Sequence, residues 1–252
     1  MLSNIIYAAT CLAVPLIIGI AVLGWYNWAR FDSVFETGYS YQLAGPYLQK
    51  YSHVLFSPLY LLPNLYNYLL MPPKINLAFP FLQPVAGYGA DQLSTMSLPP
   101  IYSSGELTGL LFSAPFVLFV GIPVLSLLSR KKVSNDQVDP ENDTFLFKWL
   151  IISLLGSFLF GLAPVITFFF VETRYIADFM PSLVLLSIIG FWQGCSFLDN
   201  KPVLHKLYVA VGIILMVASI IASILLALSA HAEQFQEFNP VLWNHLIRLF
   251  SR

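Results

Sequence analysis

Five stretches of the chain carry no charged residue over roughly the 20 positions that a helix needs to cross a bilayer core. They cover Ile5–Gly24, Leu107–Leu128, Trp149–Phe170, Phe179–Leu198 and Leu207–Ala230. This pattern predicts an all-α integral membrane protein with about five transmembrane helices, forming a single membrane domain over residues 1–252. Four of the stretches contain proline, and we expect ordinary kinks there, because neighbouring helices can satisfy the backbone groups that proline frees within a membrane.

The long region between the first two spans, residues 25–106, predicts a loop with a helix of its own. Tyr51–Met71 has no formal charge, but it contains Pro58, Pro63, asparagines and several tyrosines. Tyrosine favours the headgroup level of a membrane. The stretch therefore predicts an interfacial helix or a re-entrant hairpin, and the alternative is a sixth span. Residues 72–104 are punctuated by proline and glycine, which indicates a long irregular loop.

The C-terminal tail, residues 231–252, places apolar residues at near-helical spacing. These residues are Phe238, Leu242, Leu246, Leu249 and Phe250. Polar and charged residues stand between them, so the tail predicts an amphipathic helix lying in the membrane interface.

Lysine and arginine predict the orientation of the chain. Residues 129–148 carry four of them and the short linker 199–206 carries two, whereas the much longer region 25–106 carries only three. The positive-inside rule therefore assigns 129–148 and 199–206 to the cytoplasm. The N-terminus is then cytoplasmic, and the long loop, the loop Glu172–Asp178 and the tail face outward.

Composition agrees with the membrane class. The chain is 58% hydrophobic and 10% charged, whereas soluble domains carry about 25% charged residues. The net charge of −1 argues against a nucleic-acid partner, which would require a basic face. The first 29 residues hold no Lys or Arg, so the N-terminus predicts an uncleaved transmembrane helix and not a secretory signal. We expect the protein in a plasma membrane.

The motif search leaves two polar stretches as the candidate site. No spacing of metal ligands, Gly-rich phosphate loop or G-x-S-x-G elbow is present, so no metal and no cofactor is indicated. The first stretch, Tyr26–Gly45, and the second, Glu172–Pro181, hold charges and tyrosine beside predicted spans. Both are predicted to lie on the outer face and to line one site. Its candidate residues are Arg30, Asp32, Glu36, Tyr39, Tyr41 and Gln42 from the first stretch, with Arg174 and Asp178 from the second.

The arginines point to phosphate chemistry, with a simpler alternative for each. A guanidinium at the headgroup level can grip a lipid-linked phosphate bidentately. Alternatively, Arg30 snorkels to the interface and pairs with Asp32, and Arg174 pairs with Glu172 and Asp178 in a network that caps the next helix. The tyrosines of the first stretch are suited to stacking on sugar rings, and they are equally suited to an interfacial belt.

Three patches of the sequence resemble a known family. YNWARFDSVFETGYSYQL, LLPNLYNYLLMPP with a following FPF, and ETRYIADFMPSLVLL are similar to the C-terminal half of large bacterial multi-pass proteins of the GT-C class. That class contains the polyprenyl-phosphate-sugar glycosyltransferases, including the protein O-mannosyltransferases. The resemblance implies a bacterial membrane enzyme that moves a sugar from a lipid-phosphate donor to an acceptor on the outer face.

The resemblance also implies a missing part. The catalytic carboxylate of the class stands on an early outward loop, whereas the residues around Asp32 match a late loop, so that catalytic role is not transferred. We expect the catalytic half to be absent; if the chain is active alone, Asp32 or Glu36 is its candidate general base. Donor binding is assigned to Arg30, Tyr39, Tyr41, Gln42, Arg174 and Asp178.

Two other functions stay open. The first is a non-catalytic lipid-binding or scaffold subunit, with a membrane protein partner that supplies the missing helices. The second is a transporter, which would place ionisable residues near the bilayer midplane. The predicted spans hold no charge there, so the transporter ranks last. The expected partners are a membrane lipid, a polyprenyl-phosphate sugar and that membrane protein, with no nucleic acid.

Overall fold

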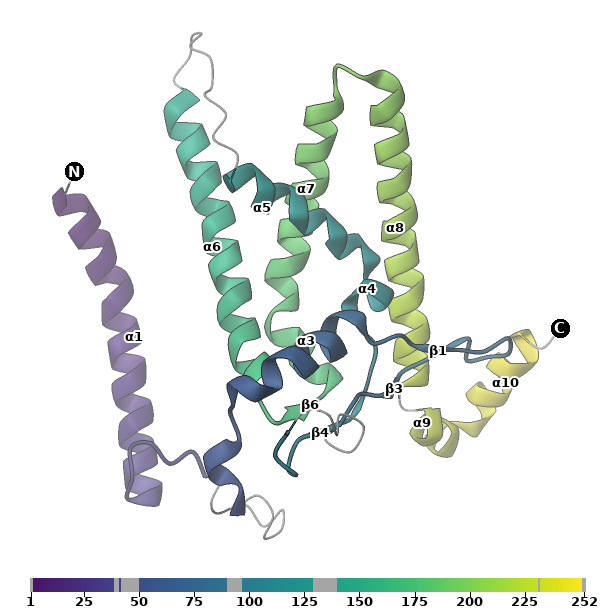
Figure 1. The fold of residues 1–252 in the computed structure, drawn as a ribbon, viewed down its shortest axis with the longest axis horizontal. Helices are drawn as coiled ribbons and strands as arrows, with labels where there is room; N and C mark the ends of the chain where they lie inside the picture. Colours follow the sequence, from purple (N-terminus) through teal and green to yellow (C-terminus); the bar gives the residue numbers. More distant parts are fainter. Residues whose placement is uncertain are drawn as a thin grey trace. The chain divides into compact units, whose positions relative to one another are not determined.

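The computed structural model describes residues 2–38, 41, 50–89, 97–128, 140–230 and 232–250. The chain divides into two compact units, Met1–Leu55 and Phe56–Arg252. Figure 1 shows the helices and strands of both units.

The described residues of the first unit contain one long helix and a short 3₁₀ helix. Helix α1 spans Leu2–Phe31, and the 3₁₀ helix η2 spans Ser52–Val54.

The second unit contains helices and two-residue strands. Its helices are η3 (Pro58–Tyr60), α3 (Leu61–Leu70), α4 (Leu110–Ser113), η4 (Pro115–Val120), α5 (Gly121–Leu128), α6 (Pro140–Thr167), η5 (Thr173–Asp178), α7 (Met180–Leu198), α8 (Pro202–Ser229), α9 (Ala232–Phe238) and α10 (Pro240–Phe250). Its strands are β1 (Lys74–Ile75), β2 (Leu82–Gln83), β3 (Val85–Ala86), β4 (Ser103–Ser104), β5 (Glu106–Leu107) and β6 (Phe170–Val171).

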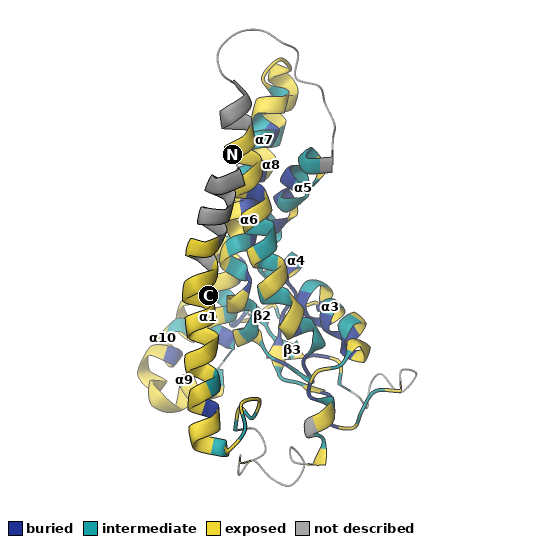
Figure 2. Cartoon of the chain, turned by 90° about the vertical axis from the view of Figure 1, so that its left-hand side faces the viewer, coloured by how far each residue is buried: buried dark blue, intermediate teal, exposed yellow. Residues whose placement is uncertain are grey.

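Four helices of the described residues are long and apolar enough to cross a membrane. They are Ala13–Phe31 within α1, Phe145–Thr167 within α6, and the whole of α7 and α8. Many residues along these helices are exposed (Figure 2), and the large exposed ones are mostly aliphatic or aromatic. Water would solvate such side chains poorly and lipid would solvate them well. The chain is therefore an integral membrane protein of the all-α class.

The predicted span 107–128 is not one continuous helix, which corrects the expectation of an ordinary kink. It is divided into α4, η4 and α5, and the break falls at Ala114, whose φ and ψ are −145° and 64°. Pro115 favours a break at this point, because the ring of a proline disfavours the helical region for the residue before it. Helix α8 repairs the break: Ser219 Oγ accepts a hydrogen bond from Phe116 N at 3.0 Å, and Ser223 Oγ donates to Ser113 O at 3.2 Å.

Glycines allow the helices of the second unit to approach closely. A Cβ on Gly190 of α7 would lie 2.0 Å from the carbonyl oxygen of Phe119 in η4. A Cβ on Gly194 would collide with the ring of Tyr208 in α8, and one on Gly212 would collide with Phe191. Such small residues at helix contacts are the usual means of packing within a membrane.

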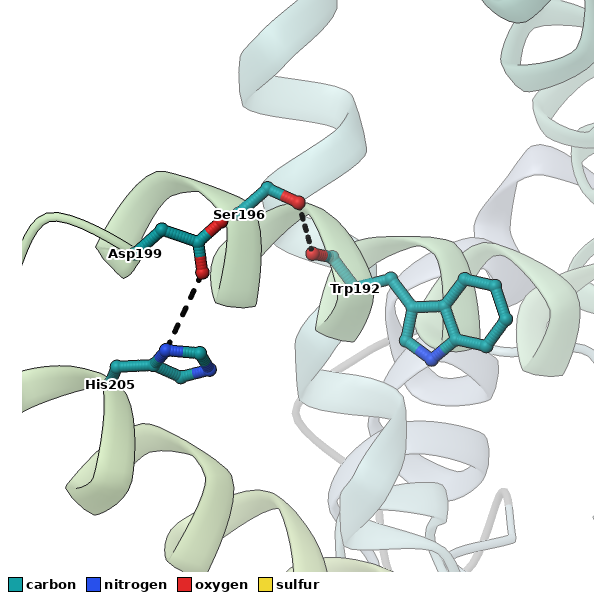
Figure 3. A network of polar contacts seen from close by, with 4 residues as sticks. All are labelled: Trp192, Ser196, Asp199 and His205. Atoms are coloured by element: carbon teal, nitrogen blue, oxygen red, sulfur yellow. Dashed lines mark hydrogen bonds and ion pairs between the residues drawn. The ribbon is translucent and has the colours of Figure 1, made fainter. Parts of the chain in front are cut away.

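The turn between α7 and α8 is short and closed by polar contacts (Figure 3). His205 Nδ1 lies 3.4 Å from a carboxylate oxygen of Asp199, and Ser196 Oγ donates to Trp192 O at 3.3 Å. The indole of Trp192 points away from this pair (Figure 3). Both partners of the ion pair are solvent-accessible, so it contributes little to stability.

The end of the bundle opposite that turn is called here the loop end; there α6 and α8 finish and α7 begins (Figure 1). Strand β1 pairs with β2 and β3 with β5, both antiparallel, while β4 pairs with β6 in parallel. Pairing of β4 with β6 joins the long loop to the loop between α6 and α7. The second-unit part of the long loop and the 172–178 loop therefore share one end of the bundle, and the tail follows α8 at that same end (Figure 1).

A buried asparagine ties α3 to the end of α6. Asn64 is fully buried, and its Nδ2 donates to the carbonyl oxygens of Val165 at 3.3 Å, Ile166 at 2.9 Å and Phe168 at 2.8 Å. Its Oδ1 accepts from the hydroxyl of Tyr102 at 2.8 Å. The carbonyls of Val165 and Ile166 belong to the last turn of α6, where carbonyls lack a partner within the helix, and Phe168 follows that turn directly. Helix α3 has ten residues, about 15 Å, which is too short to cross a bilayer core.

A second asparagine, Asn67, extends the same network into the long loop. Its Nδ2 donates to Tyr88 O at 3.2 Å and to the Tyr102 hydroxyl at 3.3 Å, and its Oδ1 accepts from Tyr88 N at 3.0 Å. Tyr60 stacks on Tyr102 with ring centroids 5.1 Å apart. Burial raises the pKa of both Tyr60 and Tyr102 above the ordinary value for tyrosine. The loop end is thus a packed structure of its own.

Candidate functional site

Arg30, the first predicted phosphate ligand, is held by aromatic neighbours on its own helix. Its Nη1 donates to the hydroxyl of Tyr26 at 2.7 Å, and its guanidinium lies 5.2 Å from the ring centroid of Phe31. Arg30 and Asp32 are both described, and they form no ion pair with each other. The simpler alternative of an Arg30–Asp32 pair is therefore not what the structure contains. Arg30 is exposed.

The two candidate general bases take part in the turn that ends α1. Asp32 has a φ of 54°, the left-handed conformation that commonly terminates a helix and that aspartate tolerates better than most residues. Glu36 Oε1 accepts from Gly38 N at 2.7 Å. Tyr41 stacks on Phe31 with centroids 5.2 Å apart. Tyr39 and Gln42 lie outside the described residues.

Arg174, the second predicted phosphate ligand, is exposed on η5. Its guanidinium lies 5.1 Å from the ring centroid of Tyr175, and its Nη2 is 3.4 Å from the hydroxyl of that tyrosine. Asp178 is also exposed and ends η5. Both charged side chains can therefore reach the aqueous boundary at the loop end.

The backbone of the 172–178 loop is fixed by contacts from distant parts of the chain. Glu172 N donates to the Tyr68 hydroxyl at 3.2 Å, and Thr173 Oγ1 donates to Glu106 O at 2.8 Å. Burial is the main cause that raises the pKa of Tyr68 above its ordinary range. The Glu172 carboxylate lies against Gly105, where an added Cβ would be 2.8 Å from Oε2.

The proposed meeting of the two polar stretches is left as a prediction. Arg30, Asp32, Glu36 and Tyr41 belong to the first unit, whereas Arg174 and Asp178 belong to the second. Within each unit the candidates are local neighbours.

The cavities of the second unit reveal a feature that the sequence reasoning did not find, a groove between α7, α8 and the broken segment α4–η4. It consists of two pockets of about 330 and 380 Å³. Their lining is mostly apolar and comprises Pro84, Thr108, Leu110, Ser113, Ala114, Phe116, Val117, Thr173, Ile176, Ala177, Met180, Val184, Ser187, Met216, Ser219, Ile220, Ser223, Leu226, Ala227 and Ala230. We call this set the apolar groove. Ala114, Met180 and Ser223 line both pockets, so the two are contiguous.

A third pocket, of about 370 Å³, adjoins the apolar groove at the loop end. Its lining is mostly polar and comprises Gln83, Pro84, Glu106, Ser229, Ala230, Ala232, Glu233 and Gln234. We call this set the polar mouth. Pro84 and Ala230 line both the polar mouth and the apolar groove. The arrangement is therefore a cavity with a polar end and a long apolar end.

One polar group of the apolar groove has no hydrogen-bond partner among the described residues. Thr108 is 5% exposed, and its Oγ1 makes no hydrogen bond with the described residues. A buried hydroxyl without a partner carries a free-energy cost of about 1–3 kcal/mol. A polar atom of a bound molecule would remove that cost.

Glu106 and Glu233 are the acidic residues that the sequence reasoning missed. Each is a charged residue beside a predicted span, as Arg30 is, and this position in the sequence could have identified them. Glu106 directly precedes the predicted span 107–128, and Glu233 follows the span 207–230 by three positions. Arg174 and Asp178 line neither the polar mouth nor the apolar groove.

Among the described residues, no group of three or more histidine, cysteine, aspartate or glutamate side chains is placed to hold a metal ion. Comparison of the chain with protein-family models, with curated proteins and with solved structures found no match.

Proposed function

We propose that this chain is a membrane module of a GT-C-like glycosyltransferase that binds a polyprenyl-phosphate-sugar donor at its loop end. The observation that carries the proposal is the continuity of the apolar groove with the polar mouth. A polyprenyl-linked sugar has the same two-part character, because a long hydrocarbon chain is joined to a phosphate and a hydroxylated ring. The pocket volumes fall within the roughly 300–1,000 Å³ of typical ligand sites.

The hydrocarbon chain is assigned to the apolar groove. Groove walls formed by α7, α8 and the broken segment supply aliphatic side chains and few polar atoms. The backbone groups freed at Ala114 do not face the chain unsatisfied, because Ser219 and Ser223 bond to that segment. A lipid can therefore lie beside the break without exposing an unpaired amide to hydrocarbon.

The sugar is assigned to the polar mouth. Carboxylates of Glu106 and Glu233 accept hydrogen bonds from sugar hydroxyls, and the amides of Gln83 and Gln234 can both donate and accept. The same two carboxylates repel a phosphate. We therefore assign the phosphate to Arg174, which follows Thr173 of the groove lining, and we place it at the outer membrane face.

The acid–base chemistry of this proposal has four candidates. Asp32 and Glu36 come from the first stretch, and Glu106 and Glu233 from the polar mouth. A general base must lie within hydrogen-bonding reach of the acceptor hydroxyl. Glu106 is the favoured candidate, because its own backbone carbonyl is fixed by Thr173 at 2.8 Å.

Photo-crosslinking tests the groove. The purified protein in nanodiscs is exposed to a polyprenyl phosphate with a photoreactive group on its chain, and labelled peptides are mapped. We expect labels on α7 and α8 at the apolar groove. Ala227→Trp fills the groove and should reduce labelling about tenfold, equivalent to about 1.4 kcal/mol of binding free energy. Ala218→Trp is the matched control, because Ala218 is an exposed alanine of the same helix that lines none of these pockets.

Equal labelling of the two tryptophan variants would refute the groove as the lipid site. Sugar transfer from a polyprenyl-phosphate donor then separates the enzyme from its alternative, the non-catalytic lipid-binding subunit. The glycosyltransferase module is supported if the donor binds and its sugar is transferred, and if the Glu106→Gln variant no longer transfers the sugar. Binding without transfer, even with a copurified membrane partner that supplies the missing helices, supports the non-catalytic subunit.

A further inference from the structure

A second apolar surface lies away from the groove, where the β1–β2 hairpin meets the C-terminal helix α10 (Figure 1). We define the hairpin–tail unit as residues Lys74–Gln83 with Pro240–Phe250. We propose that this unit is a membrane-surface anchor whose exposed apolar side chains insert among lipid headgroups beside the end of α8. The proposal is independent of the groove and of any enzymatic activity.

The two halves of the unit are joined by an aromatic cluster. The ring of Phe79 lies 5.3 Å from that of Trp243 and is stacked on Phe250 at 5.5 Å, while Phe81 meets Phe250 edge-on at 5.4 Å. Phe235 of α9 meets the other side of Trp243 at 5.5 Å. Trp243 is 6% exposed. The cluster therefore sets the position of the hairpin against the helix.

Exposed apolar side chains surround this aromatic cluster, and we call them the rim. Leu77 at the hairpin tip is fully exposed and Ile75 is 76% exposed. On α10, Leu249 is 61% and Leu242 45% exposed. Single exposed apolar residues are ordinary on protein surfaces, but these gather on one small unit. Residues 75–82 of the hairpin also contain no ionisable side chain.

The place of the unit in the fold identifies what covers this rim. Helix α8, which is long and apolar enough to cross a membrane, ends at Ser229 and is followed at once by α9 and α10. Strand β2 packs against α8. The unit therefore stands at the level where the hydrocarbon core gives way to headgroups. An amphipathic helix at that level lies with its apolar side about 5–10 Å into the headgroup boundary.

Environment-sensitive labels test the anchor. Cysteines are introduced at Leu77 and Leu249, one per protein, after the natural Cys11 and Cys195 are replaced by serine. Each is labelled with a nitrobenzoxadiazole dye in phosphatidylcholine nanodiscs that carry a nitroxide near the headgroup. Asn244→Cys is the matched control, because it is exposed and lies about 140° around the helix from Leu249. All three positions are exposed, so the substitutions leave the packing intact.

We expect dye at Leu77 and Leu249 to be quenched by the nitroxide lipid at least about threefold more than dye at Asn244, as insertion into the headgroup boundary requires. Equal quenching at the three positions would overturn the anchor. Dye that is shielded from water yet not quenched by lipid would also overturn it, because a protein surface would then cover the rim.

Discussion

The two polar stretches of this chain look alike in sequence and are built differently. In the first unit, Arg30 contacts Tyr26 and Phe31, and the turn after α1 is closed by residues within the same short segment. In the second unit, the 172–178 loop is held by Tyr68 and by the backbone of Glu106. A polar stretch beside a span can thus be a local helix end or a part of a packed structure, and the long-range contacts decide which.

The largest difference is expected when a buried asparagine is replaced in each unit. Asn64→Leu removes the donor to three carbonyls at the end of α6 and should lower the free energy of unfolding by about 3 kcal/mol or more, because each buried group left unpaired costs about 1–3 kcal/mol. Asn27→Leu removes one bond to Val34 O and should cost about 1 kcal/mol. SDS-induced unfolding in mixed micelles measures both. Equal losses would remove the distinction between the units.

Glycine substitutions should act in opposite directions in the two units. Gly190→Ala forces η4 away from α7 and should destabilise by about 1–3 kcal/mol, the usual cost of overpacking. Gly19→Ala in α1 meets nothing within 4 Å and should stabilise the helix by about 0.5–1 kcal/mol. The same micelle unfolding measurement applies. A destabilising Gly19→Ala would mean that another surface covers α1 at that point.

A smaller effect is expected at the 172–178 loop itself. Tyr68→Phe removes the hydroxyl that accepts from Glu172 N, so hydrogen exchange of that amide should accelerate about tenfold, which corresponds to about 1.4 kcal/mol of local opening. Tyr26→Phe removes the acceptor of Arg30 and no backbone bond, so amide exchange around residues 26–31 should not change. Mass spectrometry of exchanged peptides provides the readout, and an unchanged rate in Tyr68→Phe would show that other contacts hold the loop.

The mildest effect concerns alkaline pH. Burial raises the pKa of Tyr68 and Tyr102 above the ordinary value, so above about pH 10 the unfolded chain loses these protons while the folded chain keeps them. This contribution to stability is complete below pH 10 and declines as pH rises through the folded pKa. The unfolding midpoint between pH 8 and 11 should fall less steeply in Tyr102→Phe. An identical slope would exclude Tyr102 as a cause.

The helices of the fold were largely readable from the sequence. Residues 180–198 form a helix almost where the charge-free run predicted it, because length and apolarity alone define such a segment. The break at Ala114 was not predicted. Pro115 indicated that the helix is disturbed there. The helix can break, and not only kink, because Ser219 and Ser223, about a hundred positions later, bond to the backbone groups that the break frees.

The candidate site was readable only in part. The asparagines of Tyr51–Met71 argue against a lipid-facing span, which fits the burial of Asn64 and Asn67. Their partners lie up to 104 positions away, and no local pattern indicates them. Glu106 and Glu233 flank predicted spans as Arg30 does. Only the packing of β5, α8 and α9 brings the two carboxylates to one pocket, and such packing depends on contacts that spacing does not encode.

The repair of the broken segment by α8 has a consequence for how the protein is made. Residues 110–128 leave the ribosome about a hundred residues before Ser219 and Ser223 do. Until then the amide of Phe116 and the carbonyl of Ser113 lack the acceptor and donor that they have in the finished protein, and lipid offers no substitute. Biogenesis of this segment therefore waits for a later helix, and a nascent chain stalled before α8 should keep it beside the insertion machinery or in water.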